Sequence, residues 1–136
     1  MKAILLDTNA YTAFKRNHED MIDVLRHIEI IGLNSVIVGE LLSGFALGSK
    51  ERRNREELNT FMSSSRVKIF PITEATAGFY AKVYLSLRKN GTPIPTNDMW
   101  IAASALEHGC AVCTFDHDFQ KIDGLIVGSS LMQFIP

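Results

Sequence analysis

Cysteine and tryptophan are scarce in this sequence, and no long run is purely apolar. Two cysteines in 136 residues are too few for a disulfide framework, and one tryptophan offers little stacking surface for a carbohydrate cleft. The least charged stretches contain Gly, Asn, Ser and a carboxylate, which excludes a typical membrane span. The opening apolar run ends at Asp7, too soon for a secretory signal. We therefore expect a cytoplasmic protein that does not associate with membranes.

An excess of charge of one sign is also missing. The chain has 14 Lys and Arg against 15 Asp and Glu, a net charge of −1. No overall basic field indicates nucleic-acid binding, although a local basic patch can suffice for it. With 46% hydrophobic residues, a chain of this length predicts one domain, residues 1–136, with a full core.

The two cysteines, Cys110 and Cys113, have the spacing of a redox or metal motif. The segment 111–115 instead predicts a short buried strand, on which residues three apart point to opposite faces. A zinc site would need a second pair of ligands, and the four histidines show no metal-site spacing. We interpret both cysteines as small buried hydrophobic residues.

Short apolar runs alternate with helical patterns along the chain. Strands are predicted at residues 3–6, 30–33, 67–70, 111–115 and 125–127, and helices at 11–15, 19–28, 36–47, 50–62, 73–89 and 97–108. This alternation indicates a mostly parallel sheet of four to five strands with helices on both faces. Helix 36–47 is almost entirely apolar, so we expect it to be buried on most sides and to form a hairpin with helix 50–62.

Four carboxylates stand apart from every other charge in their part of the sequence. They are Asp7 within 3–14, Glu40 within 30–49, Asp98 within 90–106, and Asp116 after the uncharged run 109–115. Such surroundings are typical of buried backbone, where an unpaired ionised carboxylate is costly. The four fall near the carboxyl ends of predicted strands, where α/β sheets bind ligands. Either distant residues pair with all four, or they converge on a positive group such as a divalent metal ion.

Each acid also has a structural interpretation. Asp7 and Asp98 could cap or begin helices, and Asp116 could belong to a polar turn. Glu40 is hardest to explain in this way, because it lies inside a helix among small and apolar neighbours. Four acids without a basic partner favour a hard cation, Mg²⁺ or Mn²⁺, which can support phosphodiester cleavage.

Other carboxylate chemistries fit less well. Metal-free acid–base pairs, as in glycosidases and aspartic proteases, need only two acids. A phosphoaspartyl enzyme of the haloacid-dehalogenase type would need a second Asp two residues after Asp7, where this chain has Asn9. Phosphate-loop, dinucleotide-binding and serine-nucleophile motifs are absent from the sequence.

Four motifs, in order, resemble those of PIN-domain ribonucleases, and in particular the VapC toxins of prokaryotic toxin–antitoxin pairs. They are Leu5–Asn9, Gly39–Gly44 preceded by Ser35, Asn97–Ala103 and Thr114–Phe119. The resemblance implies a three-layer α/β/α sandwich and an acidic pocket that binds Mg²⁺ or Mn²⁺. It also implies endonucleolytic RNA cleavage by a metal-activated water, leaving a 5′-phosphate and a 3′-hydroxyl.

The resemblance also implies site residues and partners. Catalysis and metal binding are assigned to Asp7, Glu40, Asp98 and Asp116, with support from Asn9 and Thr114 and a secondary position at Asp118. The partners implied are an RNA substrate, a cognate antitoxin and a second copy in a homodimer, or a higher toxin–antitoxin assembly. A solitary RNA-processing nuclease and an inactive PIN-like module that binds protein or RNA are the alternatives.

One basic cluster stands out in this nearly neutral chain. Its members are Lys50, Arg52, Arg53 and Arg55. They are the best candidates for contacts with RNA phosphates. A solvated helix face with interspersed glutamates is the competing interpretation.

Overall fold

The apolar runs become the strands of one five-stranded sheet. The structure, a computed structural model, describes residues 2–135, and the predicted domain limits of 1–136 reach one residue beyond this range at each end. The strands are β1 (Ala3–Leu6), β2 (Ile30–Asn34), β3 (Val67–Phe70), β4 (Ala111–Cys113) and β5 (Val127–Gly128). The helices are α1 (Thr8–Lys15), α2 (Glu19–His27), α3 (Ser35–Leu47), α4 (Glu51–Met62), α5 (Glu74–Asn90) and α6 (Thr96–His108), with short 3₁₀ turns η1 (His117–Lys121) and η2 (Leu131–Gln133).

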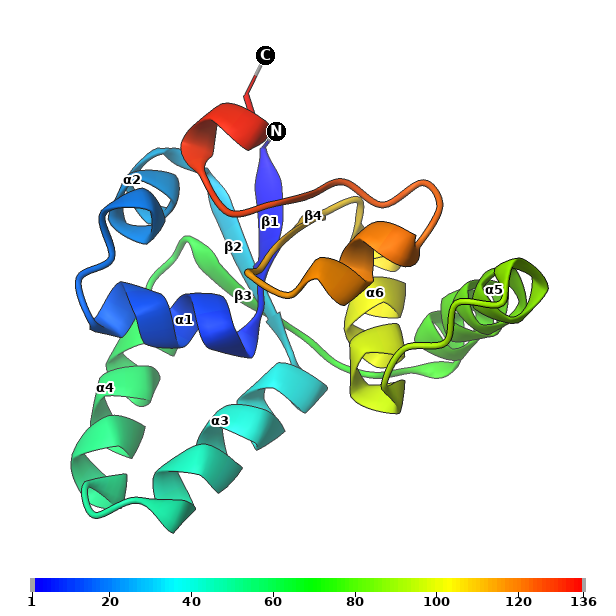
Figure 1. The fold of residues 1–136 in the computed structure, drawn as a ribbon. Coiled ribbons are helices and arrows are strands. Elements are labelled where there is room, and N and C mark those ends of the chain that lie inside the picture. The colour runs from blue at the N-terminus through cyan, green and yellow to red at the C-terminus, as the bar shows by residue number, and fades with distance from the viewer. Residues whose placement is uncertain (1, 136) are drawn as a thin grey trace.

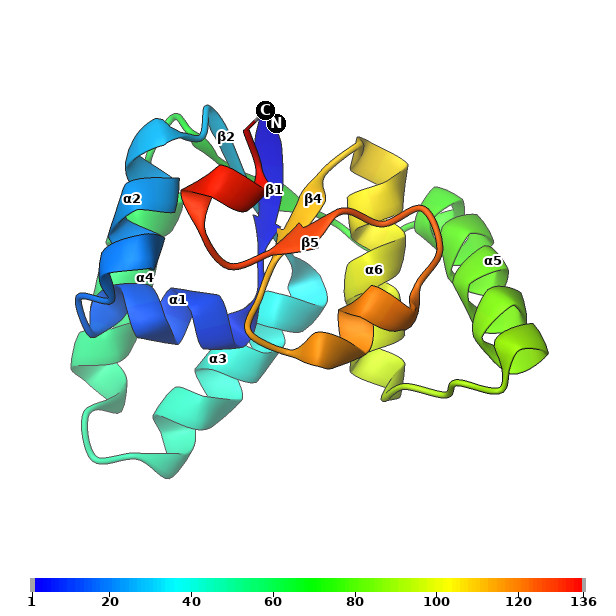
Figure 2. The same ribbon diagram turned by 45° about the horizontal axis from the view of Figure 1, so that its top comes forward.

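All strand pairs are parallel, and the order across the sheet is β3-β2-β1-β4-β5. Figures 1 and 2 show α1, α2 and α4 on one side of the sheet and α5 and α6 on the other. Because both faces are covered, Ile4, Leu5 and Leu6 of the central strand are fully buried. The predicted three-layer α/β/α sandwich with a parallel sheet is confirmed.

The strand order decides where the residues after each strand lie. Because β2, β1 and β4 are neighbours, their carboxyl ends meet at one edge of the sheet. β4 ends at Cys113, before the predicted limit of residue 115, although the Thr114 backbone N–H still donates to the Gly128 carbonyl at 3.0 Å. α1 begins at Thr8, three residues earlier than predicted, because Asp7 already caps it.

The expectation that helix 36–47 is buried on most sides is wrong. Only Ile37 and Leu41 of α3 are buried, and Leu47 at its end is 92% exposed. α3 extends away from the sheet into a hairpin with α4 (Figure 1), so its buried residues lie in its first half, and Leu42 and Phe45 pack against the core while only partly buried. The predicted hairpin itself is confirmed, and the apolar character of α3 is left largely on its surface.

Buried polar contacts hold α3 against α6. The Asn34 Oδ1 atom accepts a hydrogen bond of 2.9 Å from the Ile37 backbone, which caps α3. The Asn34 Nδ2 atom donates to the Ser104 hydroxyl of α6 at 2.9 Å. Both side chains are completely buried, so this contact fixes the start of α3 relative to α6.

The predicted role of the cysteines as buried hydrophobic residues is confirmed. Cys110 and Cys113 are free and buried, and burial raises the pKa of their thiols to about 11 and about 12. Both therefore stay protonated at neutral pH and are poor nucleophiles. None of the helices in residues 2–135 combines the length and the apolar character that a membrane crossing requires.

Candidate active site

Asp7 lies where β1 ends, held by donors from α1 and from the segment after β4. Its Oδ1 atom accepts a hydrogen bond from the Thr8 backbone at 2.8 Å, and its Oδ2 atom accepts one from the Thr114 hydroxyl at 2.8 Å. Only 5% of the residue is exposed. Desolvation by burial raises the pKa of Asp7, and the negative charges of Glu40 and Asp116 raise it further, against the effect of the two hydrogen bonds. The carboxylate is therefore positioned rigidly and short of positive charge.

Asn9 and Thr114 connect the ends of β1 and β4. The Asn9 Nδ2 atom donates to the Thr114 hydroxyl at 3.2 Å, and its Oδ1 atom accepts from the Phe115 backbone at 3.0 Å. The Thr114 hydroxyl also accepts a hydrogen bond from the Asp116 backbone at 3.0 Å. The two polar residues expected to support the acids thus orient both Asp7 and the loop that carries Asp116.

Three carboxylates face one another beside Asp7. Oxygen atoms of Asp98, Asp116 and Asp118 all lie within 4.8 Å of one another, and the three side chains are half-buried. Desolvation, followed by the negative charges of Asp7, Asp116 and Glu40, raises the pKa of Asp98 to about 7. The Asp116 carboxylate also accepts from the Asp118 backbone at 2.9 Å, which fixes the turn into η1.

Glu40 is bound to the elements on either side of it. Its Oε1 atom accepts from the Thr8 hydroxyl at 2.7 Å, and its Oε2 atom accepts from Asn97 Nδ2 at 3.3 Å. Glu40 and Asn97 also line an open groove of about 590 Å³ between α3 and α6. Thr8 and Asn97 were not predicted as site residues. The signal for them in the sequence is their position, because each is the direct neighbour of a predicted acid.

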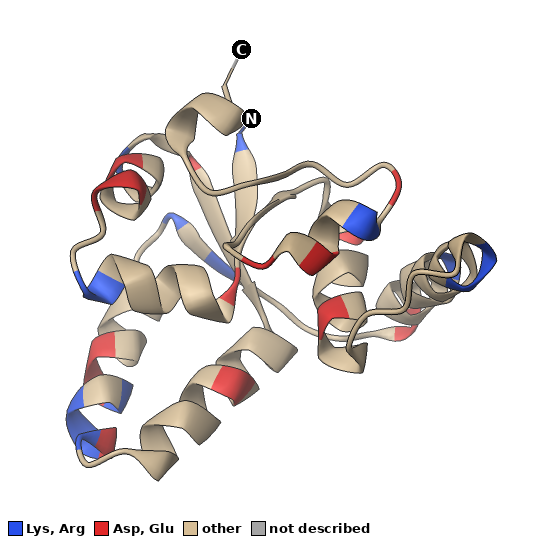
Figure 3. Ribbon diagram, viewed as in Figure 1, with Lys and Arg blue, Asp and Glu red and all other residues tan. Residues whose placement is uncertain are grey.

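The structure therefore brings together five acids, which we call the acidic edge: Asp7, Glu40, Asp98, Asp116 and Asp118. Figure 3 shows acidic segments from separate elements meeting where the strands end. Within residues 2–135, Lys121, which pairs with Asp118 at 3.0 Å, is the only Lys or Arg that forms an ion pair with this set. An all-oxygen donor set with so little neutralisation fits a hard divalent cation.

The predicted basic cluster does not stay together. Lys50 and Arg53 line a cleft that faces α1, whereas Arg52 and Arg55 line a separate outer surface of α4. Arg52 pairs with Glu56 one turn later at 3.3 Å. Figure 3 shows these cations at the far end of the hairpin, away from the strand ends. Arg52 and Arg55 thus lie on the solvated helix face of the competing interpretation, and contact with RNA phosphates stays a prediction for Lys50 and Arg53.

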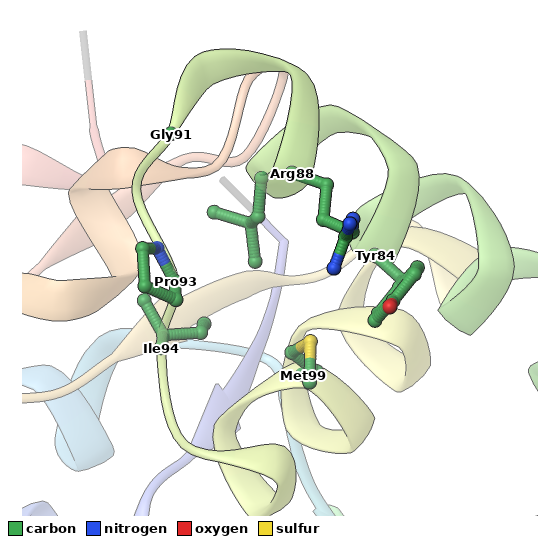
Figure 4. A pocket seen from close by; sticks show the side chains of 7 residues that line it. Tyr84, Arg88, Gly91, Pro93, Ile94 and Met99 are labelled. Carbon is green, nitrogen blue, oxygen red and sulfur yellow. The ribbon is translucent and has the colours of Figure 1, made fainter.

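A separate cavity of about 320 Å³ lies between α5 and α6 (Figure 4). Leu87, Ile94 and Met99 supply most of its apolar lining, and Arg88 and Tyr84 stand at one side. The guanidinium carbon of Arg88 is 6.0 Å from the centroid of the Tyr84 ring. No residue of the acidic edge lines this cavity, so it is distinct from the candidate site.

The chain is a parallel α/β/α sandwich with carboxylates gathered beyond its strand ends. These features place it in the class of α/β proteins whose binding site is rich in carboxylates. The chain belongs to the PIN domain family, whose model matches residues 4–125. It is 34% identical over 88 residues to Ribonuclease VapC4 of Mycobacterium tuberculosis, which covers 65% of this chain and 68% of that protein.

Two further similarities extend over more of the chain. The plasmid stability protein StbB of Pseudomonas syringae pv. tomato is 35% identical over 124 residues, covering 83% of this chain and 87% of StbB. A crystal structure of VapBC-5 from Mycobacterium tuberculosis, a member of the VapBC family of toxin–antitoxin systems, matches with a TM-score of 0.71 and 26% identity. That match covers 94% of this chain and 97% of the other.

Proposed function

We propose that this protein is a Mg²⁺- or Mn²⁺-dependent endoribonuclease and the toxin of a toxin–antitoxin pair. The observation that carries the proposal is the meeting of Asp98, Asp116 and Asp118 beside Asp7 and Glu40. Membership of the PIN domain family and the similarity to a ribonuclease support RNA as the substrate. The carboxylate chemistry supports the dependence on a divalent ion.

The residues have different roles in this proposal. Asp98, Asp116 and Asp118 would hold the ion, and Asp7 would add a fourth carboxylate from the end of β1. When bound there, the ion would offset the negative charge of the carboxylates, lower the pKa of a water molecule and stabilise charge on a phosphodiester. Glu40 lies close enough to Asp7 and Asp98 for its charge to raise the pKa of both, and Thr8 and Asn97 hold both of its oxygen atoms.

Asn9 and Thr114 act through the acids. By binding Asp7 and the Asp116 backbone, they set the distance between the ends of β1 and β4. Preorganisation of this kind lets the carboxylates face the substrate without rearrangement.

The proposed protein partners are inferred from the proteins to which this chain is similar. Similarity to VapBC-5 supports a cognate antitoxin, and a half-exposed apolar α3 is consistent with a covered surface in the assembled complex. We propose that the chain acts in the cytoplasm, as a homodimer or within a higher toxin–antitoxin assembly.

The test is RNA cleavage by the purified protein. Single-stranded RNA incubated with Mg²⁺ or Mn²⁺ should yield products with 5′-phosphate ends, and excess chelator should stop the reaction. Asp7→Asn and Asp98→Asn should each abolish cleavage while the circular dichroism spectrum is kept. Asp123→Asn is the matched control, because Asp123 is an exposed acid that binds Ser86 and Asn90 outside the site.

The alternatives give different outcomes. Cleavage that persists in both variants or in chelator contradicts the metal mechanism. An inactive binding module would bind RNA or protein without any metal-dependent cleavage. A solitary RNA-processing nuclease would cleave RNA but would have no neighbouring antitoxin gene whose co-expression relieves growth arrest.

A further inference from the structure

A cleft of about 420 Å³ lies between α1, α3 and the start of α4. It is lined by four cations, Lys15 and Arg16 from α1 and Lys50 and Arg53 from the hairpin, together with the single acid Glu57. We call it the basic cleft. In a chain with a net charge of −1, an excess of three positive charges in one cavity marks a local anion-binding surface.

Glu57 joins two of the four cations that line the cleft. Its Oε1 atom lies 3.2 Å from Lys15 Nζ, and its Oε2 atom lies 3.6 Å from Arg53 Nε. One carboxylate thus holds a cation from α1 and a cation from α4 on the same cavity. Arg16 and Lys50 form no ion pair within residues 2–135, so their charges are available to a ligand.

The basic cleft is continuous with the acidic edge along α1. Thr8, which binds Glu40, is followed at four-residue intervals by Thr12 and Arg16, and both of these line the cleft. Residues at this spacing share one helix face, and eight residues of helix span about 12 Å. Figure 1 shows α1 and α3 diverging from the strand ends, with α4 closing the far side. One face of α1 therefore leads from the acids to the cations.

We propose that the basic cleft binds the phosphate backbone of the RNA strand on one side of the cleaved bond. This inference rests on the proposed ribonuclease function. A phosphodiester chain carries a charge at every nucleotide, which suits cations spread over two elements along a path. The acidic edge needs such help, because its own carboxylates repel RNA until a cation neutralises them.

Binding of a short fluorescent single-stranded RNA to the full chain tests the inference. Measured in chelator, binding is separated from cleavage. Arg16→Ala/Arg53→Ala should weaken binding at least tenfold and make its salt dependence shallower by about 0.7 per lost phosphate contact. Arg52→Ala/Arg55→Ala is the matched control, since it removes the same amount of charge from α4 but outside the cleft, and it should change binding less than twofold.

A substitution in the basic cleft should also be able to strengthen RNA binding. Glu57→Gln removes the only acid that lines the cleft, so it should tighten RNA binding two- to fivefold at low salt and lose this gain at high salt. With Mg²⁺ added, the Arg16→Ala/Arg53→Ala variant should raise KM for RNA and leave kcat within twofold. Unchanged circular dichroism spectra confirm that each variant is folded.

Several results would overturn the inference. The cleft and control variants could weaken RNA binding equally, or RNA binding could be undetectable in the parent chain. The cleft variants could instead keep RNA binding and lose only the binding of a poly-glutamate peptide, which would assign the cleft to an acidic protein partner. Binding through the cleft without any cleavage would reject the proposed function, and would keep only the part of the inference that assigns RNA binding to the cleft.

Discussion

The acidic edge and the cations near α4 are built in opposite ways. The acidic edge collects five carboxylates from segments between residues 7 and 118, which the order of parallel strands brings to one place. The cations from 50 to 55 are nearly adjacent in sequence, yet the helix divides them between two surfaces. Isolation in sequence therefore indicated a shared site, and adjacency in sequence did not.

Removing one charge from each region should produce the largest difference between the two regions. Asp98→Asn should lower the rate of RNA cleavage by roughly a thousandfold, because losing an ion ligand costs several kcal/mol of transition-state stabilisation. Arg52→Ala should leave the rate within twofold. Initial rates at saturating Mg²⁺ provide the measurement, and similar losses in the two variants would contradict the distinction between the regions.

Divalent ions should stabilise only through the acidic edge. At 100 times the dissociation constant, Mg²⁺ or Mn²⁺ should add about 2.7 kcal/mol to the free energy of unfolding. For a chain of this size, this raises Tm by about 10 °C. Asp98→Asn/Asp116→Asn should lose most of the increase in a thermal melt, whereas Arg52→Ala/Arg55→Ala should keep it. An increase that survives in the first variant would place the ion elsewhere.

The acidic edge should also make the metal-free protein less stable as pH rises. Because the pKa of Asp98 is about 7 in the folded protein and 3.8 in its ordinary state, the folded chain holds a proton that the unfolded chain releases between these values. The proton on Asp98 therefore stabilises the folded protein at low pH. Raising the pH from 5 to 8 should lower the free energy of unfolding by about 1–2 kcal/mol after solvent screening.

Chemical denaturation at the two pH values, in chelator, measures this change. Asp98→Asn should make the dependence flatter, and the difference between variant and parent removes the contribution of the histidines. Arg55→Ala should leave the slope unchanged. A variant that retains the full slope would show that other groups cause it.

The hydrogen bonds to Glu40 should have a smaller effect. Asn97→Ala removes one donor to a charged carboxylate, worth about 1.5 kcal/mol, so cleavage should slow by roughly tenfold with Tm little changed. Ser86→Ala is the control, since its hydroxyl binds Asp123 outside the site at a similar 3.3 Å. Equal activity in both variants would mean that Glu40 needs no support from α6.

The smallest effect belongs to the outer surface of α4. The Arg52–Glu56 pair is exposed, with 94% and 68% of the two side chains accessible, and its separation is 3.3 Å. Arg52→Ala/Glu56→Ala should change the free energy of unfolding by less than about 0.5 kcal/mol in a urea titration. A larger loss would mean that this surface contacts more than solvent.

The sequence predicted the layers and the acids for clear physical reasons. Strands buried on both faces must be apolar throughout, so a run such as Ile4 to Leu6 indicates a parallel sheet before any contact is known. The resemblance to PIN-domain ribonucleases added the order of the motifs. Asp118 was predicted only as a secondary position, since the family varies there, and the sequence does not show that the turn after Asp116 brings its carboxylate close to Asp98.

The remaining features depend on tertiary contacts that have no local signal. An apolar pattern such as that of α3 cannot reveal that the helix extends away from the sheet and exposes Leu47. Nor can the sequence around Lys15 and Arg53 indicate that Glu57 brings them together across two helices.

The position of the acids along the chain has a consequence for protein synthesis. Asp7 is translated first, but Asp116 and Asp118 follow roughly 5 to 20 seconds later at ordinary rates of about 5–20 residues per second. The β4 strand that must pair with β1 is made in the same late interval. A ribosome that stops before β4 therefore releases a fragment with one side of β1 unpaired and two carboxylates missing. Incomplete translation of this chain should therefore yield a fragment that lacks the complete acidic edge.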